Sequence, residues 1–67
     1  MSKRQLQIYE YIKGYIKKHQ YSPTINEITD AVSLKSTSTT HGHIERMRTQ
    51  GYIDFIKMRS RTLQILR

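Results

Sequence analysis

Small polar side chains gather in one stretch of this 67-residue sequence, and their chemistry is hydrogen bonding. The stretch runs from Ser36 to His43 and reads Ser-Thr-Ser-Thr-Thr-His-Gly-His. Hydroxyl and imidazole groups can donate and accept hydrogen bonds, so they suit the edges of nucleic-acid bases as well as phosphates. A purely structural reading is also open, because Ser and Thr are common at the start of a helix, where they cap it.

A second set of residues carries positive charge. Lys57, Arg59 and Arg61 alternate through a polar segment that also contains Ser60, and Arg46 follows the hydroxyl-rich stretch. Lys and Arg at such positions can bind phosphates. A solvated loop tip, or for Arg46 a favourable interaction with a helix dipole, is the alternative. We favour phosphate binding for the segment 57–61 because three of its five residues are basic.

Catalytic and metal chemistry find no support in the residue pattern. There is no cysteine, no paired carboxylate site and no glycine loop that could cradle a phosphate. His41 and His43 are two positions apart, so they do not share a helix face, and no third ligand is placed. We therefore predict no catalytic residue, no metal and no cofactor. An enzyme is the least favoured class, since so small a core leaves little room for a pocket.

The hydroxyl-rich stretch is predicted to lie on a helix of residues 37–50, with Ser36 as N-cap and Ser38 as its competitor. At 100° per residue, one side of this helix faces the core and contains Thr40, Ile44, Met47 and Gly51. The other side is polar, with Ser38, Gly42, Glu45 and Thr49 at its centre and Thr39, His41 and Arg46 beside them. Gly51 fits the position after the helix end, where a left-handed conformation is usual.

Two earlier helices are predicted from capping boxes and apolar spacing. Ser2 with Gln5 starts one over residues 3–19, and Thr24 with Glu27 starts another over residues 25–33, behind Pro23. The buried stripe of the first contains Ile8, Ile12, Tyr15, Ile16 and His19, with Leu6 off the stripe. The core face of the second contains Ile25, Ile28, Ala31 and Val32. Residues 33–35 form the turn before the hydroxyl-rich helix.

After Gly51 the pattern changes to that of a β-hairpin over residues 52–66, with the basic segment 57–61 at its tip. We expect Ile53, Phe55, Leu63 and Ile65 to pack the hairpin on the helices, because a two-stranded hairpin is marginal alone. The fold class is mainly α with a small hairpin, as one domain over residues 1–67. Two helices joined by a short turn, followed by a basic hairpin, make a three-helix winged helix-turn-helix.

Charge supports a polyanionic partner. Twelve Lys and Arg against five Asp and Glu give a formal charge of +7. The excess lies in residues 1–20 and 52–67, whereas residues 21–34 contain two acids and no Lys or Arg. Two basic arms therefore flank a central reading element, which predicts that both ends of the chain bind phosphates beside it; a merely basic soluble domain is the alternative. Together with the helix-turn-helix, this favours double-stranded DNA as the partner. No long apolar run or cleavable leader is present, so we expect a cytoplasmic protein without membrane contact, on the nucleoid when bound to DNA.

Four residues of the helix over 37–50 have specific interpretations. Gly42 weakens a helix interior, which suggests that a DNA base edge or backbone approaches it closely; packing against another helix is the alternative. Glu45 could accept a hydrogen bond from cytosine N4 or repel phosphate and sharpen specificity, or be a solvated charge. His41 is interpreted as a donor to a base edge or phosphate, and His43 as partly buried or near a phosphate.

The ordered set of these motifs resembles the N-terminal DNA-binding domain of the LexA repressor family. The residues that carry the resemblance cover nearly the whole chain, at 2–6, 21–24, 27–28, 36–44 and 51–53. The Ser-Thr-x-His-Gly-His run is similar to the Gram-positive branch, whereas the enterobacterial branch has Asn, Ala and two Glu around these positions.

The resemblance implies a helix in the major groove that reads bases through Ser38, Thr39, His41 and Gly42, with the wing at the adjacent minor groove or backbone. Ser36 matches a family position near phosphates, as do the N-terminal Ser2, Arg4 and Gln5. The resemblance also implies a palindromic operator with GAAC-type half-sites, a homodimer on that DNA, and a role in a bacterial or phage SOS response.

The sequence departs from the family because it ends at Arg67, before a linker, an Ala-Gly cleavage pair and a Ser/Lys protease domain. We therefore expect neither self-cleavage nor the family's C-terminal dimerisation from this chain, which is either an excised domain or a small stand-alone relative. Repression and activation stay open, as do the operator sequence, the oligomeric state and a host or phage origin. The alternative function is a protein-interaction module that binds another transcription regulator or RNA polymerase, through Met58 and Tyr52.

Overall fold

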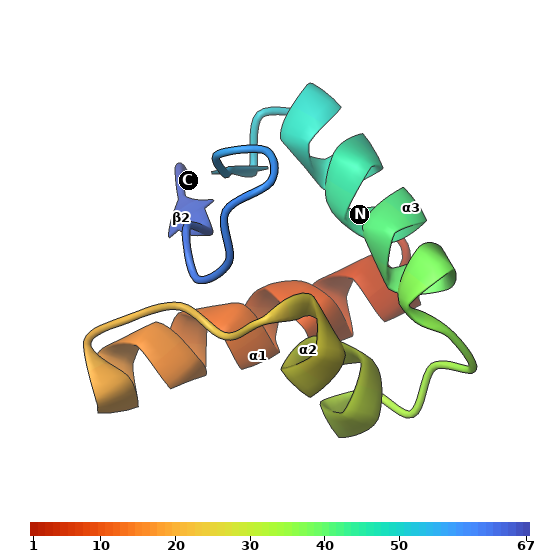
Figure 1. The fold of residues 1–67 in the computed structure, drawn as a ribbon. Coiled ribbons are helices and arrows are strands. Elements are labelled where there is room, and N and C mark those ends of the chain that lie inside the picture. Colours follow the sequence, from red (N-terminus) through yellow and green to blue (C-terminus); the bar gives the residue numbers. More distant parts are fainter.

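Three helices and one short hairpin make up the computed structural model, which describes all residues from Met1 to Arg67 (Figure 1). The helices are α1 (Lys3–His19), α2 (Ile25–Ala31) and α3 (Thr37–Thr49). The strands β1 (Ile53–Asp54) and β2 (Gln64–Ile65) pair antiparallel, with Ile53 opposite Ile65. This is the winged helix-turn-helix that the sequence predicts. None of the helices combines the length and apolar character needed to cross a membrane.

The helix starts follow the capping signals in the sequence. Ser2 and Gln5 form a capping box at α1, and Thr24 and Glu27 form one at α2. Ser36 is the N-cap of α3, where its hydroxyl accepts a hydrogen bond from the Thr39 N–H at 3.3 Å. Gly51 has φ +84, the left-handed conformation expected after a helix end. The predicted ranges 25–33 and 37–50 extend one or two residues past the observed helix ends.

A single core joins the helices to the hairpin. Its fully buried side chains are Ile8 and Ile12 from α1, Ile28 from α2, Ile44 and Met47 from α3, and Ile53 from β1. Leu63, Phe55 and Ile65 pack the hairpin against this core, as predicted. In Figure 1 the loop between β1 and β2 (blue) reaches from the end of α3 down toward α1.

Two predicted core positions are wrong. His19 is exposed because α1 ends there and Gln20 turns the chain with φ 67. Its ring packs against the ring of Tyr15, with the two ring centres 4.2 Å apart, instead of entering the core. Ala31 is exposed at the end of α2, whose buried residues are Ile28 and Thr29. Leu6, which lies off the predicted stripe, remains 47% exposed.

The hairpin is shorter than predicted. Each strand has two residues, and residues 55–63 form a loop with turns at 57–58 and 60–61. Thr62 closes this loop, because its hydroxyl donates toward the Ile56 carbonyl at 3.3 Å and accepts from the Ile56 N–H at 2.9 Å. We call residues 55–63 the wing loop.

Candidate DNA interface

The outer side of α3 is polar, as the helical spacing predicts. Thr40, Ile44 and Met47 are fully buried on its inner side. The exposed residues on its outer side are Ser38, Thr39, His41, Glu45 and Arg46, and Gly42 among them is half-buried. We call these six residues the outer face of α3. No apolar side chain of α3 points to solvent, so this face has no need of a covering protein element.

The outer face keeps most of its hydrogen-bonding capacity unused. Ser38, His41 and Glu45 form no side-chain hydrogen bond within the protein. The Ser36 hydroxyl is occupied by the cap and lies 3.2 Å from the Thr39 hydroxyl. A partner that approaches α3 therefore meets hydrogen-bonding groups without partners at Ser38 and His41. The Ser36 hydroxyl is already used by the N-cap of α3.

Gly42 has no packing partner in the protein. A Cβ added there would lie 3.7 Å from the nearest side-chain atom, the mobile end of Arg46, which is an ordinary van der Waals distance. Packing against another helix, the structural alternative, therefore does not explain this glycine.

A buried hydrogen bond holds α3 against α2. The hydroxyls of Thr29 and Thr40 lie 2.6 Å apart, and both side chains are buried. Thr29 also donates to the carbonyl of Ile25 at 2.8 Å. Because buried hydroxyls must be satisfied, this pair fixes how the two helices of the motif meet and so where the outer face of α3 points.

The tip of the wing loop is exposed and lies next to α3. Lys57, Arg59 and Ser60 make no side-chain hydrogen bond, and Met58 is fully exposed. A groove of about 520 Å³ separates the wing loop from α2 and α3. The polar residues that line it include Asn26, Thr37, His41, Arg59 and Ser60. Thr37, an exposed residue in the first turn of α3, is a candidate that sequence reasoning missed; only its place beside Ser36 could have indicated it.

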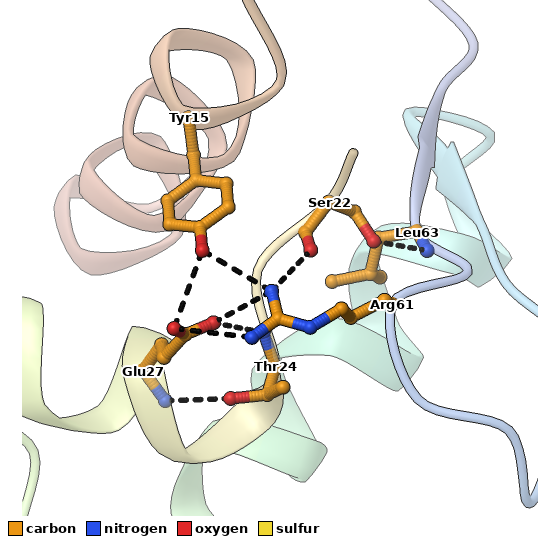
Figure 2. Close-up of polar contacts among 6 residues, drawn as sticks. All are labelled: Tyr15, Ser22, Thr24, Glu27, Arg61 and Leu63. Atoms are coloured by element: carbon orange, nitrogen blue, oxygen red, sulfur yellow. Dashed lines mark hydrogen bonds and ion pairs between the residues drawn. The ribbon is translucent and has the colours of Figure 1, made fainter. Parts of the chain in front are cut away.

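Arg61 differs from Lys57 and Arg59, the other basic residues of the wing loop, because its side chain binds other groups of the protein (Figure 2). Its guanidinium donates to the Tyr15 hydroxyl and to the Ser22 carbonyl, both at 3.1 Å. It also lies 3.1 Å from a carboxylate oxygen of Glu27. The side chain of Arg61 thus turns toward α1 and α2, and its role as a DNA contact stays a prediction. The sequence could not reveal this orientation, since its partners are 34 to 46 positions away.

The N-terminal candidates differ in how available they are. Gln5 is only 6% exposed, and its side chain accepts from the Ser2 N–H at 3.4 Å as part of the cap. The Ser2 hydroxyl accepts from the Gln5 N–H at 3.2 Å. Arg4 is exposed but donates to the Val32 carbonyl at 2.6 Å, which ties α1 to the end of α2. Gln5 thus offers little side-chain surface to a partner, and its contact with DNA stays a prediction.

His43 lies between the outer face and the core. It is half-buried, and its Nδ1 atom is buried without a hydrogen-bond partner. Burial, followed by the nearby charges of Arg46 and Arg4, lowers the pKa of His43 below its ordinary value. Both effects favour the uncharged ring. The expectation that His43 is partly buried is confirmed, and its nearness to a phosphate stays a prediction.

The carboxylate of Glu27 is stabilised in its charged form. The hydrogen bond from the Thr24 N–H, at 2.8 Å, is the largest cause of its lowered pKa, and the interactions with Arg61 and Tyr15 act in the same direction. Glu27 thus serves two structures at once, the cap of α2 and the contact with the wing loop (Figure 2).

Comparison with known proteins agrees with this geometry. Residues 1–62 match the family model described as the LexA DNA binding domain. The LexA repressor of Geobacillus thermodenitrificans is 46% identical over 66 residues, which are 98% of this chain and 32% of that protein. The LexA repressor of Clostridium kluyveri is 44% identical over 63 residues, 94% of this chain and 31% of that protein.

The LexA repressor of Staphylococcus carnosus is 42% identical over 66 residues, again 98% of this chain and 32% of the relative. The chain thus spans about a third of the length of the curated relatives that it matches. The match favours DNA binding over the alternative of a protein-interaction module. With the family model covering residues 1–62, this chain belongs to the LexA DNA-binding domain family.

Proposed function

We propose that this protein is a sequence-specific, double-stranded DNA-binding regulator of transcription that places α3 in the major groove. The observation that carries the proposal is the outer face of α3, where Ser38 and His41 have no hydrogen-bond partner and lie beside Gly42, against which no other helix packs. An α-helix fits the major groove of B-DNA, and short hydroxyls or an imidazole reach base edges only when the helix comes close.

Within this proposal the residues divide by what they contact. Ser38, Thr39, His41 and Gly42 face base edges, and Glu45 restricts which bases are accepted. Arg46, Lys57, Arg59 and Ser60 face the phosphates or the adjacent minor groove, together with Arg4 and the region of Ser2, Ser36 and His43. Contacts with phosphates set the register and the affinity of the protein on DNA, and contacts with base edges set its sequence preference. The proposed activity is binding, and no chemical step is assigned.

The proposed DNA site is a palindrome with GAAC-type half-sites, bound by two copies of the domain. One helix-turn-helix covers one half-site, so a palindrome needs a second copy, held through protein contacts or through DNA alone. The relatives are named LexA repressor, which supports regulation by occupying an operator.

Fluorescence anisotropy with labelled duplexes tests the proposal. The variants Ser38→Ala and His41→Ala should lose about 1 to 3 kcal/mol of binding free energy on the palindromic duplex and little on a scrambled one. Gln64→Ala, which alters an exposed polar residue of β2, is the matched control and should bind like the unmodified protein. Equal losses on both duplexes for Ser38→Ala and His41→Ala would contradict base reading by α3.

A further inference from the structure

The wing loop is too weakly paired to be held in place by its own hairpin. Only Ile53 and Asp54 pair with Ile65 and Gln64, and residues 55–63 have no partner strand. The Thr62 hydroxyl bonds to Ile56 and to the Arg59 carbonyl, but these contacts stay within the loop. Something outside the hairpin must therefore fix the direction in which its tip points.

Arg61 supplies contacts to the rest of the fold from inside the wing loop. Its guanidinium reaches Tyr15 of α1, the carbonyl of Ser22 in the connection, and Glu27 of α2 (Figure 2). It also lies 4.9 Å from the ring centre of Tyr21. The Tyr15 hydroxyl in turn donates to Glu27 at 3.2 Å, which closes the network. Side chains from three separate parts of the chain thus converge on one residue of the loop.

Backbone geometry at this point agrees with a loop held by side-chain contacts. Arg61 has φ 56, a left-handed conformation that is unfavourable for a residue with a Cβ. Next to it, the Leu63 N–H donates to the buried Ser22 hydroxyl at 3.1 Å. Ser22 therefore anchors the returning arm of the wing loop through both its side chain and its carbonyl.

We infer that Arg61 is a positioning residue that holds the wing loop at a fixed distance from α3, so that Lys57 and Arg59 meet the same duplex as the outer face. We call the contacts of Arg61 with Tyr15, Ser22 and Glu27 the wing clasp. This inference rests on the proposed function, because it states how the wing loop takes part in DNA binding. Arg61 lines the groove between the wing loop and α3, so the clasp also sets the width of that groove.

Direct phosphate binding by Arg61 is disfavoured by its surroundings. Glu27 already neutralises the guanidinium at 3.1 Å, and a phosphate that approached Arg61 would also approach this carboxylate. Lys57 and Arg59, in contrast, have no acidic partner and no side-chain hydrogen bond. The loop therefore divides its cations into two that are free for DNA and one that is engaged by the protein.

Removing the charge of Glu27 should change DNA affinity in opposite directions for the two possible roles of Arg61, phosphate binding and positioning of the wing loop. If Arg61 bound phosphate, Glu27→Gln would remove a repulsive charge and release the guanidinium, and DNA binding would strengthen. If Arg61 positions the wing, the same change weakens the clasp, and binding weakens although the protein becomes more positive. Glu27→Gln is suited to this test because glutamine still completes a capping box. Asp30→Asn removes the same charge from an exposed site on α2 outside the clasp and is the matched control.

Anisotropy on the palindromic duplex gives the first measurement. Glu27→Gln and Arg61→Gln should each weaken binding roughly three- to tenfold, because the free loop must then be ordered on binding. The double variant should lose no more than either single variant, and Asp30→Asn should bind as tightly as the unmodified protein or more tightly. Arg61→Lys should not restore affinity, since an ammonium cannot bridge the three partners as the planar guanidinium does.

Amide hydrogen exchange of Arg59 and Leu63 in the DNA-free protein gives the second measurement, because their N–H groups donate to the Ile56 carbonyl and to the Ser22 hydroxyl. Exchange should become faster in Glu27→Gln and Arg61→Gln but not in Asp30→Asn, with the exchange of α1 amides unchanged as evidence that the fold persists. This result does not depend on DNA, so it supports the clasp even if the unmodified protein fails to bind any duplex. The inference is overturned if Glu27→Gln strengthens DNA binding, if Arg61→Lys restores it, or if exchange in the wing loop does not change.

Discussion

Replacing Gly42 with alanine should make the protein more stable and a poorer DNA binder. Glycine inside a helix is about 1 kcal/mol less favourable than alanine. The new Cβ would meet only the flexible end of Arg46 at 3.7 Å, so no steric penalty offsets this gain. For a domain of this size, about 1 kcal/mol raises the melting temperature by roughly 4 to 8 °C. On DNA, the methyl group would occupy space that we assign to a base edge or backbone, which should cost at least about 1 kcal/mol, the value of one lost base contact.

Thermal unfolding followed by circular dichroism and anisotropy on the palindromic duplex measure the two effects on the same samples. Gly14→Ala is the matched control, because Gly14 is exposed within α1 and nothing lies within 4 Å of a Cβ placed there. It should give a similar rise in melting temperature with no change in DNA affinity.

If Gly42→Ala binds the cognate duplex as tightly as the unmodified protein, DNA does not approach this position. If Gly42→Ala lowers the melting temperature, packing inside the protein explains the glycine, and the prediction is wrong.

Two further predictions concern the fold that presents α3. Thr40→Val should lower the unfolding free energy by about 1 kcal/mol, the typical net worth of a hydrogen bond. Thr29→Val and Thr40→Val together should cost less than the sum of the two single losses, although Thr29 also bonds to the Ile25 carbonyl. Chemical denaturation of both single variants and the double variant checks this, and additive losses would contradict a shared hydrogen bond. Because the pKa of His43 is lowered in the folded protein, the unfolded chain takes up a proton at this residue near pH 6.5, whereas the folded chain does so only at lower pH. The free energy of unfolding should therefore fall as pH drops through 6.5 and level off below the pKa of the folded state. Urea unfolding across this range should show a smaller fall for His43→Gln than for the control His41→Gln, and equal falls would count against this assignment.

The helices could be predicted from the sequence because their signals are local. The caps at Ser2, Thr24 and Ser36 each act over three residues, and the inner and outer sides of α3 follow from its helical period. The polar outer face was predictable for the same reason. Gly51 shows the same principle, since its left-handed backbone is a property of one residue after a helix end.

Interactions between distant residues could not be predicted. The partners of Arg61 lie on α1, the connection and α2, and nothing in the spacing of the basic segment 57–61 marks one arginine as different from the other. The burial of Gln5 and the exposure of His19 depend on where α1 meets its neighbours. Strand length was overestimated because apolar residues such as Phe55 and Leu63 can pack from a loop as well as from a strand.

Selection of bound duplexes from a random pool shows whether the outer face of α3 reads DNA sequence. The unmodified chain should enrich one motif, a palindrome of GAAC-type half-sites, and a variant with both Ser38→Ala and His41→Ala should lose that enrichment while it still retains duplexes through its cationic residues. A pool from which the unmodified chain enriches no motif, or the same motif enriched by both proteins, would contradict the account.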